Sequence, residues 1–144
     1  MSKFYITTSI PYANGTPHLG HTLEFIQTDV LARYAKLQGK DVLFSTGMDE
    51  HGSKIKDKAE SLKQDTQKYV DGIAEEFKKL LDLLQVEYTD FIRTTDSDHE
   101  KRAKLIWKKL VDNGDIYKGS YEGWYCVGDE AFFTETEVKE NGGI

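Results

Sequence analysis

Residues 3–46 alternate between strand-like and helix-like patterns, and this alternation constrains the fold more than any other feature of the chain. Residues 3–10 are rich in β-branched and aromatic side chains, as strands are, and Pro11 ends the run. After Leu19, apolar residues recur at steps of three and four, the spacing of one helix face: Leu23, Ile26, Val30, Tyr34 and Leu37. Residues 41–46 contain the unbroken apolar run of a buried parallel strand. Strand, helix and strand predict a right-handed βαβ unit, and therefore an α/β fold with a parallel sheet.

The same patterns continue to about residue 115 and then change. Helices are expected over residues 53–62, 67–84 and 96–111, with a short strand at Phe91 and Ile92. Residues 116–121 and 124–134 are aromatic and glycine-punctuated, which favours small β elements and a second module. No clear element is expected to close the chain at residues 140–144. We therefore predict one domain over residues 1–115 and the beginning of another over residues 116–144.

Composition excludes several classes of protein. A net charge of -6 and a pI near 5.2 argue against a domain that holds nucleic acid by bulk electrostatics. No apolar run is long enough for a membrane span, and the start of the chain resembles a strand rather than a signal peptide. The single cysteine, Cys126, excludes an internal disulfide and fits a reducing compartment. We expect a cytoplasmic protein without a membrane partner.

Residues 10–21 concentrate both prolines, two glycines and two of the four histidines of the chain. The segment joins the first predicted strand to the first predicted helix, where open α/β sheets bind ligands and where helix N–H groups favour anions. His18 and His21 could then hold phosphate oxygens, with Gly20 leaving room for a nucleoside. Two alternatives stay open. The histidines could simply cap the helix, or they could bind a metal ion, although no third ligand lies nearby in the sequence.

Several short segments of the sequence resemble the signature motifs of a known protein family. Residues 11–15 read PYANG and residues 18–21 read HLGH, which resembles the HIGH signature of class I aminoacyl-tRNA synthetases. Residues 47–52 (GMDEHG) and 123–135 (GWYCVGDEAFFTE) are similar to methionyl-tRNA synthetases. Isoleucyl and valyl synthetases have a Leu-Pro-Ile-Glu run where this chain has residues 53–56 (SKIK). The resemblance covers essentially the whole chain.

The resemblance implies a fold and a reaction. The fold is the first half of a Rossmann-like (HUP-type) doubly wound parallel sheet, with residues 1–115 as the amino-terminal half of the catalytic nucleotide-binding domain. Residues 116–144 would begin the connective insertion. The reaction is the ATP-dependent activation of methionine to methionyl-adenylate, followed by transfer to tRNA(Met). ATP is expected with Mg²⁺, and tRNA(Met) is expected to bind mostly through parts outside this chain.

The resemblance also assigns roles to individual residues. Those implied to bind ATP are Pro17, His18, Gly20 and His21, of which His18 and His21 are catalytic. Those implied to bind methionine are Ile10 through its backbone, Tyr12 around the thioether and Asp49 at the ammonium group. Each role has a structural alternative: Asp49 could be a turn residue or a helix N-cap, and Tyr12 could pack on the sheet edge. We expect His51 to bond to backbone and Glu50 to be solvated or paired.

Two departures from the family pattern limit what this chain can do. Relatives with a zinc knuckle carry Cys-X-X-Cys pairs near residue 123, whereas this chain has only Cys126, so no metal site is expected. The Lys-Met-Ser-Lys-Ser signature and the second half of the sheet are absent, so we interpret the chain as an amino-terminal fragment. The alternatives are a fragment that binds ATP or methionine without turnover, and the front half of an isoleucyl-type class I synthetase.

Overall fold

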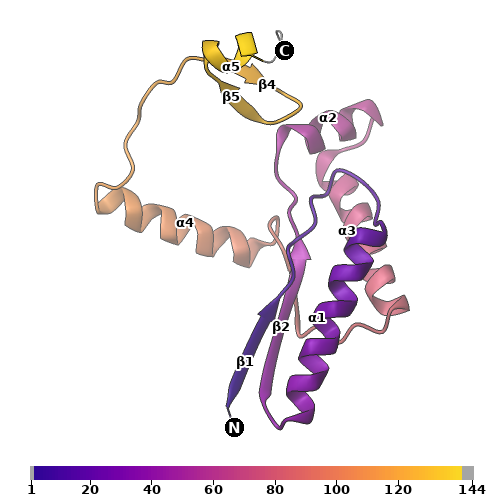
Figure 1. The fold of residues 1–144 in the computed structure, drawn as a ribbon. Coiled ribbons are helices and arrows are strands. Elements are labelled where there is room, and N and C mark those ends of the chain that lie inside the picture. The colour runs from indigo at the N-terminus through magenta and orange to yellow at the C-terminus, as the bar shows by residue number, and fades with distance from the viewer. Residues whose placement is uncertain (1, 141–144) are drawn as a thin grey trace. The chain divides into compact units, whose positions relative to one another are not determined.

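A computed structural model describes residues 2–140 of the chain. Strands and helices alternate through the first part of the sequence, and a small β hairpin and a short helix follow (Figure 1). The strands are β1 (Lys3–Thr7), β2 (Asp41–Met48), β3 (Asp90–Arg93), β4 (Trp124–Cys126) and β5 (Ala131–Phe133). The helices are α1 (Leu19–Leu37), α2 (Ser53–Ser61), α3 (Thr66–Leu83), α4 (Ser97–Asp112) and α5 (Glu135–Glu140).

The main sheet has three strands in the order β1-β2-β3, and both pairings are parallel. Ile6 lies opposite Phe44, and Thr46 lies opposite Phe91. The crossover from β1 to β2 runs through α1, so the predicted βαβ unit and the α/β fold class are confirmed.

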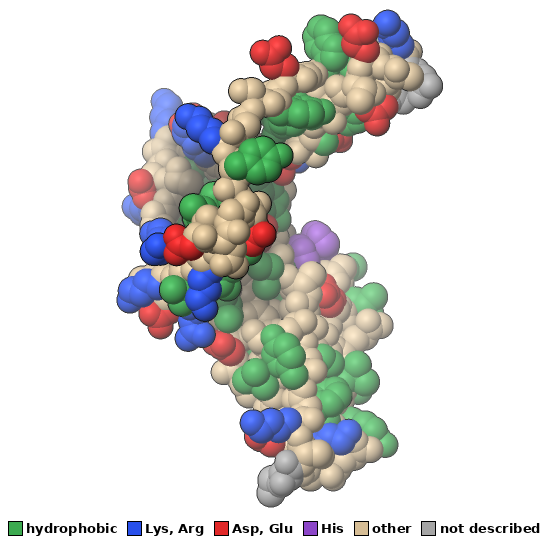
Figure 2. Space-filling view, turned by 90° about the vertical axis from the view of Figure 1, so that its left-hand side faces the viewer, with side chains coloured by type: hydrophobic (Ala, Val, Ile, Leu, Met, Phe, Trp, Pro, Cys, Tyr) green, Lys and Arg blue, Asp and Glu red, His purple; other side chains and the backbone are tan. Residues whose placement is uncertain are grey.

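Helices α1 and α3 lie on the same side of this sheet (Figure 1), and the core forms between them and β2. Phe25 of α1, Phe44 of β2 and Phe77 of α3 are each at most 1% exposed. The opposite face of the sheet is open, since Tyr5 and its neighbour Leu43 are 64% and 50% exposed. Figure 2 shows hydrophobic side chains on the surface around the amino-terminal end of the sheet. Among the described residues, therefore, only one face of a sheet of the doubly wound type is covered.

Helix α1 forms where predicted, but it buries a different face. The apolar residues that revealed its period are between 42% and 86% exposed: Leu23, Ile26, Val30, Tyr34 and Leu37. The buried positions are instead Phe25, Thr28, Asp29, Ala32 and Ala35. Two of the buried side chains, Ala32 and Ala35, are small, and small side chains permit close packing of a helix on a sheet.

Several predicted boundaries were wrong by a few residues. β1 ends at Thr7 rather than at residue 10, because the backbone N–H and the hydroxyl of Ser9 both turn to the Glu24 carboxylate, at 2.6 and 2.8 Å. β2 continues to Met48, two residues beyond the prediction. α2, α3, β3 and α4 lie within a residue or two of their predicted ranges.

The chain divides into two compact units, Met1–Leu105 and Ile106–Ile144, with the division inside α4. In the second unit, β4 and β5 pair antiparallel, whereas residues 116–121 form no strand, contrary to prediction. α5 follows β5 and was not predicted. The prediction that no clear element closes the chain concerns residues 140–144, of which 141–144 lie outside the described residues. The domain boundary at residue 115 stays a prediction. No helix within residues 2–140 combines the length and apolarity needed to cross a membrane.

Candidate functional site

The predicted site residues belong to the loops that follow β1 and β2 and to the first turn of α1. These loops leave the carboxyl ends of two neighbouring parallel strands, and the amino terminus of α1 lies at the same end of the sheet (Figure 1). Open α/β sheets bind ligands at this position.

The two loops are joined by backbone hydrogen bonds around Asp49. The Asp49 N–H donates to the Pro11 carbonyl and the Ala13 N–H donates to the Asp49 carbonyl, both at 2.8 Å. Tyr12 and Asp49 therefore lie opposite each other in a parallel bridge. Both backbone groups of Asp49 are used in this way, and its side chain is half-buried. The structure thus brings together Tyr12 and Asp49, which the sequence places 37 positions apart.

Gly52 contacts the side chain of Tyr12. Its backbone has φ +136° and ψ 159°, in a region that only glycine occupies readily. A Cβ at this position would lie 2.1 Å from the Tyr12 hydroxyl oxygen, so the phenol end packs directly against the glycine. Ile10, the third residue expected at methionine, is 41% exposed.

His18 and His21 together form a capping box at the start of α1. The Gly20 N–H donates to His18 Nδ1 at 3.1 Å, and the His18 N–H donates to His21 Nδ1 at 3.3 Å. The two rings stack with their centroids 3.7 Å apart. The capping alternative is therefore confirmed as a local role. The cap does not use the ε nitrogen of either ring. Because each Nδ1 accepts a hydrogen bond, each ring, when neutral, carries its proton on Nε2.

The environment of His21 also favours its neutral form. Its ring contacts Phe77 of the core edge-on, with the centroids 5.1 Å apart. Desolvation by this burial lowers the pKa of His21, and the nearby His18 lowers the pKa further, while Glu24 partly opposes both. Gly20 accommodates the pair, because a Cβ there would lie 3.0 Å from the His18 ring.

A second set of bonds joins the loop after β2 to the segment after β3. The Glu50 N–H donates to Thr94 Oγ1 at 2.9 Å, and the Glu50 carboxylate pairs with Arg93, with Nε and Oε1 2.7 Å apart. The Thr95 hydroxyl donates to the other carboxylate oxygen of Glu50. The sequence predicted that Glu50 would be solvated or paired, and it is paired.

The partners of Glu50 were not predicted. The available signal was their position, because Arg93 ends β3, Thr94 and Thr95 follow it, and the ends of adjacent parallel strands meet at one edge of a sheet. His51 bonds through Nε2 to the Thr94 carbonyl at 3.2 Å, which confirms its expected backbone role. The N-cap alternative for Asp49 is wrong, because the N-cap of α2 is Gly52.

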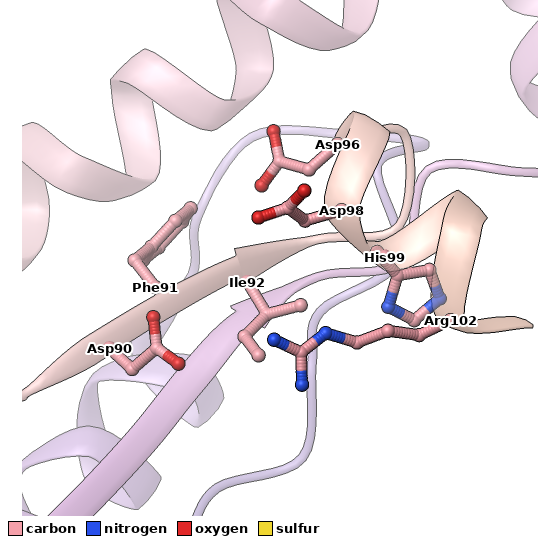
Figure 3. A pocket seen from close by; sticks show the side chains of 7 residues that line it. All are labelled: Asp90, Phe91, Ile92, Asp96, Asp98, His99 and Arg102. Carbon is pink, nitrogen blue, oxygen red and sulfur yellow. The ribbon is translucent and has the colours of Figure 1, made fainter.

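A hollow of about 390 Å³ lies along the free edge of β3, outside the predicted site. Figure 3 shows Asp96 and Asp98 on one side of it and Arg102 beneath Ile92, with His99 in the first turn of α4. None of the predicted site residues lines it.

The described part of the chain shows no group of three or more His, Cys, Asp or Glu side chains that could hold a metal ion. His18 and His21 accordingly lack a third ligand within residues 2–140. The expected absence of zinc at Cys126 stays a prediction.

Comparison with known proteins decides the family. A family model described as tRNA synthetases class I (M) matches residues 4–142. This chain belongs to that family. The resemblance read from HLGH and GMDEHG is thereby confirmed, and the isoleucyl-type alternative loses its support.

Relatives within the class I tRNA synthetases include the methionine–tRNA ligases of Rickettsia felis and Lactiplantibacillus plantarum. The first is 48% identical over 98% of this chain, and the second is 51% identical over 95%. A solved structure of Mycobacterium tuberculosis methionyl-tRNA synthetase in complex with methionyl-adenylate matches with a TM-score of 0.89 and 42% identity over 95% of the chain. This chain spans only 28% and 20% of the two ligases and 27% of the solved chain.

Proposed function

We propose that this chain supplies part of the methionine-activation site of a methionine–tRNA ligase. The single observation that carries the proposal is the likeness to the Mycobacterium tuberculosis synthetase, which is solved with methionyl-adenylate and matches at 42% identity and a TM-score of 0.89. In the proposed reaction the methionine carboxylate attacks the α-phosphate of ATP, and pyrophosphate leaves. The methionyl group then passes to the terminal ribose of tRNA(Met).

His18 and His21 would act on ATP. Their δ nitrogens accept bonds within the cap, so the neutral rings offer Nε2–H donors to phosphate oxygens. The dipole of α1 favours an anion at the same place. Donors that meet the phosphoryl oxygens better in the transition state than in bound ATP accelerate the attack.

Pro17 and Gly20 complete the proposed ATP contacts. Pro17 limits the freedom of the loop ahead of the cap, and Gly20 adds no side chain at the helix surface. Mg²⁺ would accompany ATP, bound mainly by phosphate oxygens and water, since residues 2–140 offer no cluster of carboxylates for it.

Asp49, Tyr12 and Ile10 would bind methionine. The Asp49 carboxylate is held by its fully bonded backbone and would accept hydrogen bonds from the ammonium group. Tyr12 lies opposite Asp49 and would enclose the thioether, which offers a binding site only shape, polarizability and a weak acceptor. Ile10 would present its backbone to the amino acid.

The remaining steps would depend on other parts of the protein. We propose that tRNA(Met) binds mostly outside this chain and that the protein works in the cytoplasm. A second candidate function is binding of ATP or methionine without turnover by this chain alone. The observation that favours it is the coverage, because the chain spans only 28% of the Rickettsia felis ligase.

ATP–pyrophosphate exchange tests the proposal. The purified protein is assayed with methionine, with isoleucine and without an amino acid. Exchange that needs methionine supports methionine activation. Exchange with isoleucine would contradict the assigned substrate, and methionine binding without exchange would favour the second candidate.

A further inference from the structure

The carboxylate of Glu50 is buried, and each of its two oxygens accepts a hydrogen bond. Its side chain is 0% exposed, Arg93 Nε lies 2.7 Å from Oε1, and the Thr95 hydroxyl bonds to Oε2. A buried carboxylate loses its hydration, so it persists in a fold only where cations and donors replace the lost water.

Arg93 bonds to Glu50 and to carboxylates of two further segments. Its Nη2 pairs with Asp71 of α3 at 2.7 Å, and its backbone N–H donates to the Asp96 carboxylate at 3.1 Å. The guanidinium side chain is only 17% exposed, and its hydrogen bonds to Glu50 and Asp71 raise the pKa of Arg93 against the opposing effect of burial. The loop after β2 is thus tied to α3 and to the segment that leads into α4.

Asp49 lies between this network and the loop after β1. On one side its own backbone is bonded to Pro11 and Ala13, and on the other the next residue, Glu50, is held by both backbone and side chain. With the peptide groups fixed on both sides, rotation of its own side chain is the main freedom left to the Asp49 carboxylate.

We propose that Glu50 and Arg93 are positioning residues that aim the Asp49 carboxylate at the ammonium group of the amino-acid substrate. This inference rests on the proposed function of Asp49. Glu50 and Arg93 touch neither ligand in this account; they set the affinity for the amino acid through the geometry of residues 49–52.

The energetics distinguish positioning from simple stabilisation. Apolar side chains of similar volume often replace a buried ion pair at no cost in stability, so stability alone does not require this pair. Removing only the arginine leaves a buried charge that must gain a proton or reach water. In either case the bonds that tie the loop after β2 to Arg93 are lost, which frees the loop, and Asp49 with it, to shift.

The test measures methionine and ATP dissociation constants for the full protein and for Arg93→Met. We expect methionine binding to weaken by about tenfold or more, since misalignment of one hydrogen bond between charged groups costs about that factor in affinity. ATP binding should stay unchanged. Glu50→Gln combined with Arg93→Met should recover part of the methionine affinity, because no unpaired charge remains buried; Asp71, the other partner of Arg93, is 51% exposed. Arg93→Lys, which keeps the charge, should fall between the wild type and Arg93→Met.

Asp29 and Arg33 provide a matched control. Asp29 is 7% exposed, pairs with the Arg33 guanidinium and accepts the Glu87 N–H at 2.8 Å, but it contacts none of the site loops in these bonds. Arg33→Met should therefore lower stability and leave the methionine affinity of the folded protein unchanged.

The outcomes separate the two proposals. A wild-type protein that neither binds methionine nor exchanges pyrophosphate with it overturns the proposed function and this inference together. A functional wild type in which Arg93→Met matches the Arg33→Met control, or weakens methionine and ATP equally, overturns the positioning role alone. If Arg93→Met does not fold, the double variant and Arg93→Lys decide by the same comparison.

Discussion

Replacing Gly52 with alanine should damage both the fold and the methionine site. The backbone of Gly52, at φ +136° and ψ 159°, lies in a region that side chains with a Cβ avoid. Holding a residue with a Cβ in this backbone region costs of order 1–3 kcal/mol. The new Cβ would also lie 2.1 Å from the Tyr12 hydroxyl oxygen. Because nonbonded heavy atoms of this kind settle at roughly 3.5 Å, the phenol must withdraw by more than about 1 Å.

The expected free energy of unfolding therefore falls by about 1–3 kcal/mol. Urea denaturation measures this loss, and titration calorimetry with methionine measures the consequence for the site. Methionine affinity should fall as well, because the displaced Tyr12 is the proposed wall around the thioether and lies opposite Asp49.

Gly72→Ala is the matched control. Gly72 lies on the exposed side of α3, and a Cβ there would meet nothing within 4 Å. Alanine should stabilise the helix by about 0.8–1.0 kcal/mol and leave methionine affinity unchanged. If Gly52→Ala unfolds at the same urea concentration as the wild type, the strain argument is refuted. A loss of stability without a change in methionine affinity would refute the role of Tyr12.

Two further predictions concern His21. His21→Ala should slow adenylate formation in single-turnover assays far more than it weakens methionine binding, because the ring is proposed to act on phosphate. Equal losses would show that His21 serves only to cap α1. Burial lowers the pKa of His21 below its usual 6.5, so the unfolded chain binds more protons there. The stability contributed by the neutral ring is present above about pH 6.5 and declines as the pH falls below that value. Urea unfolding between pH 7 and pH 5 should therefore show a shallower decline for His21→Gln than for the wild type, and identical slopes would contradict this assignment.

The βαβ unit could be predicted because its signals are local. The β-branched run before Pro11 and the apolar run in residues 41–46 each have one reasonable interpretation, and α1 must cross between them. The buried face of α1 could not be predicted in the same way. Its most regular apolar stripe, which includes Leu23 and Val30, is exposed, while Phe25 packs into the core.

The site also contains residues that local patterns predict and contacts that only the fold creates. His18, His21 and Asp49 stood out because they belong to compact motifs next to strand ends. Glu50 and Arg93 are 43 positions apart in the sequence. They meet only because β3 pairs beside β2, and no local sequence pattern predicts that pairing. Tyr12 and Gly52 likewise meet only after both loops close over the strand ends.

The most direct test of the central claim is the methionine dissociation constant of the full protein with Asp49→Asn. The substitution keeps the size of the side chain and removes the charge proposed to bind the ammonium group. Hydrogen bonds to charged groups contribute about 1.5–3 kcal/mol, so affinity should fall roughly 10- to 100-fold. Asp57→Asn, on the exposed surface of α2, should bind methionine as the wild type does. Equal affinities for wild type and Asp49→Asn would contradict a methionine site at the ends of β1 and β2.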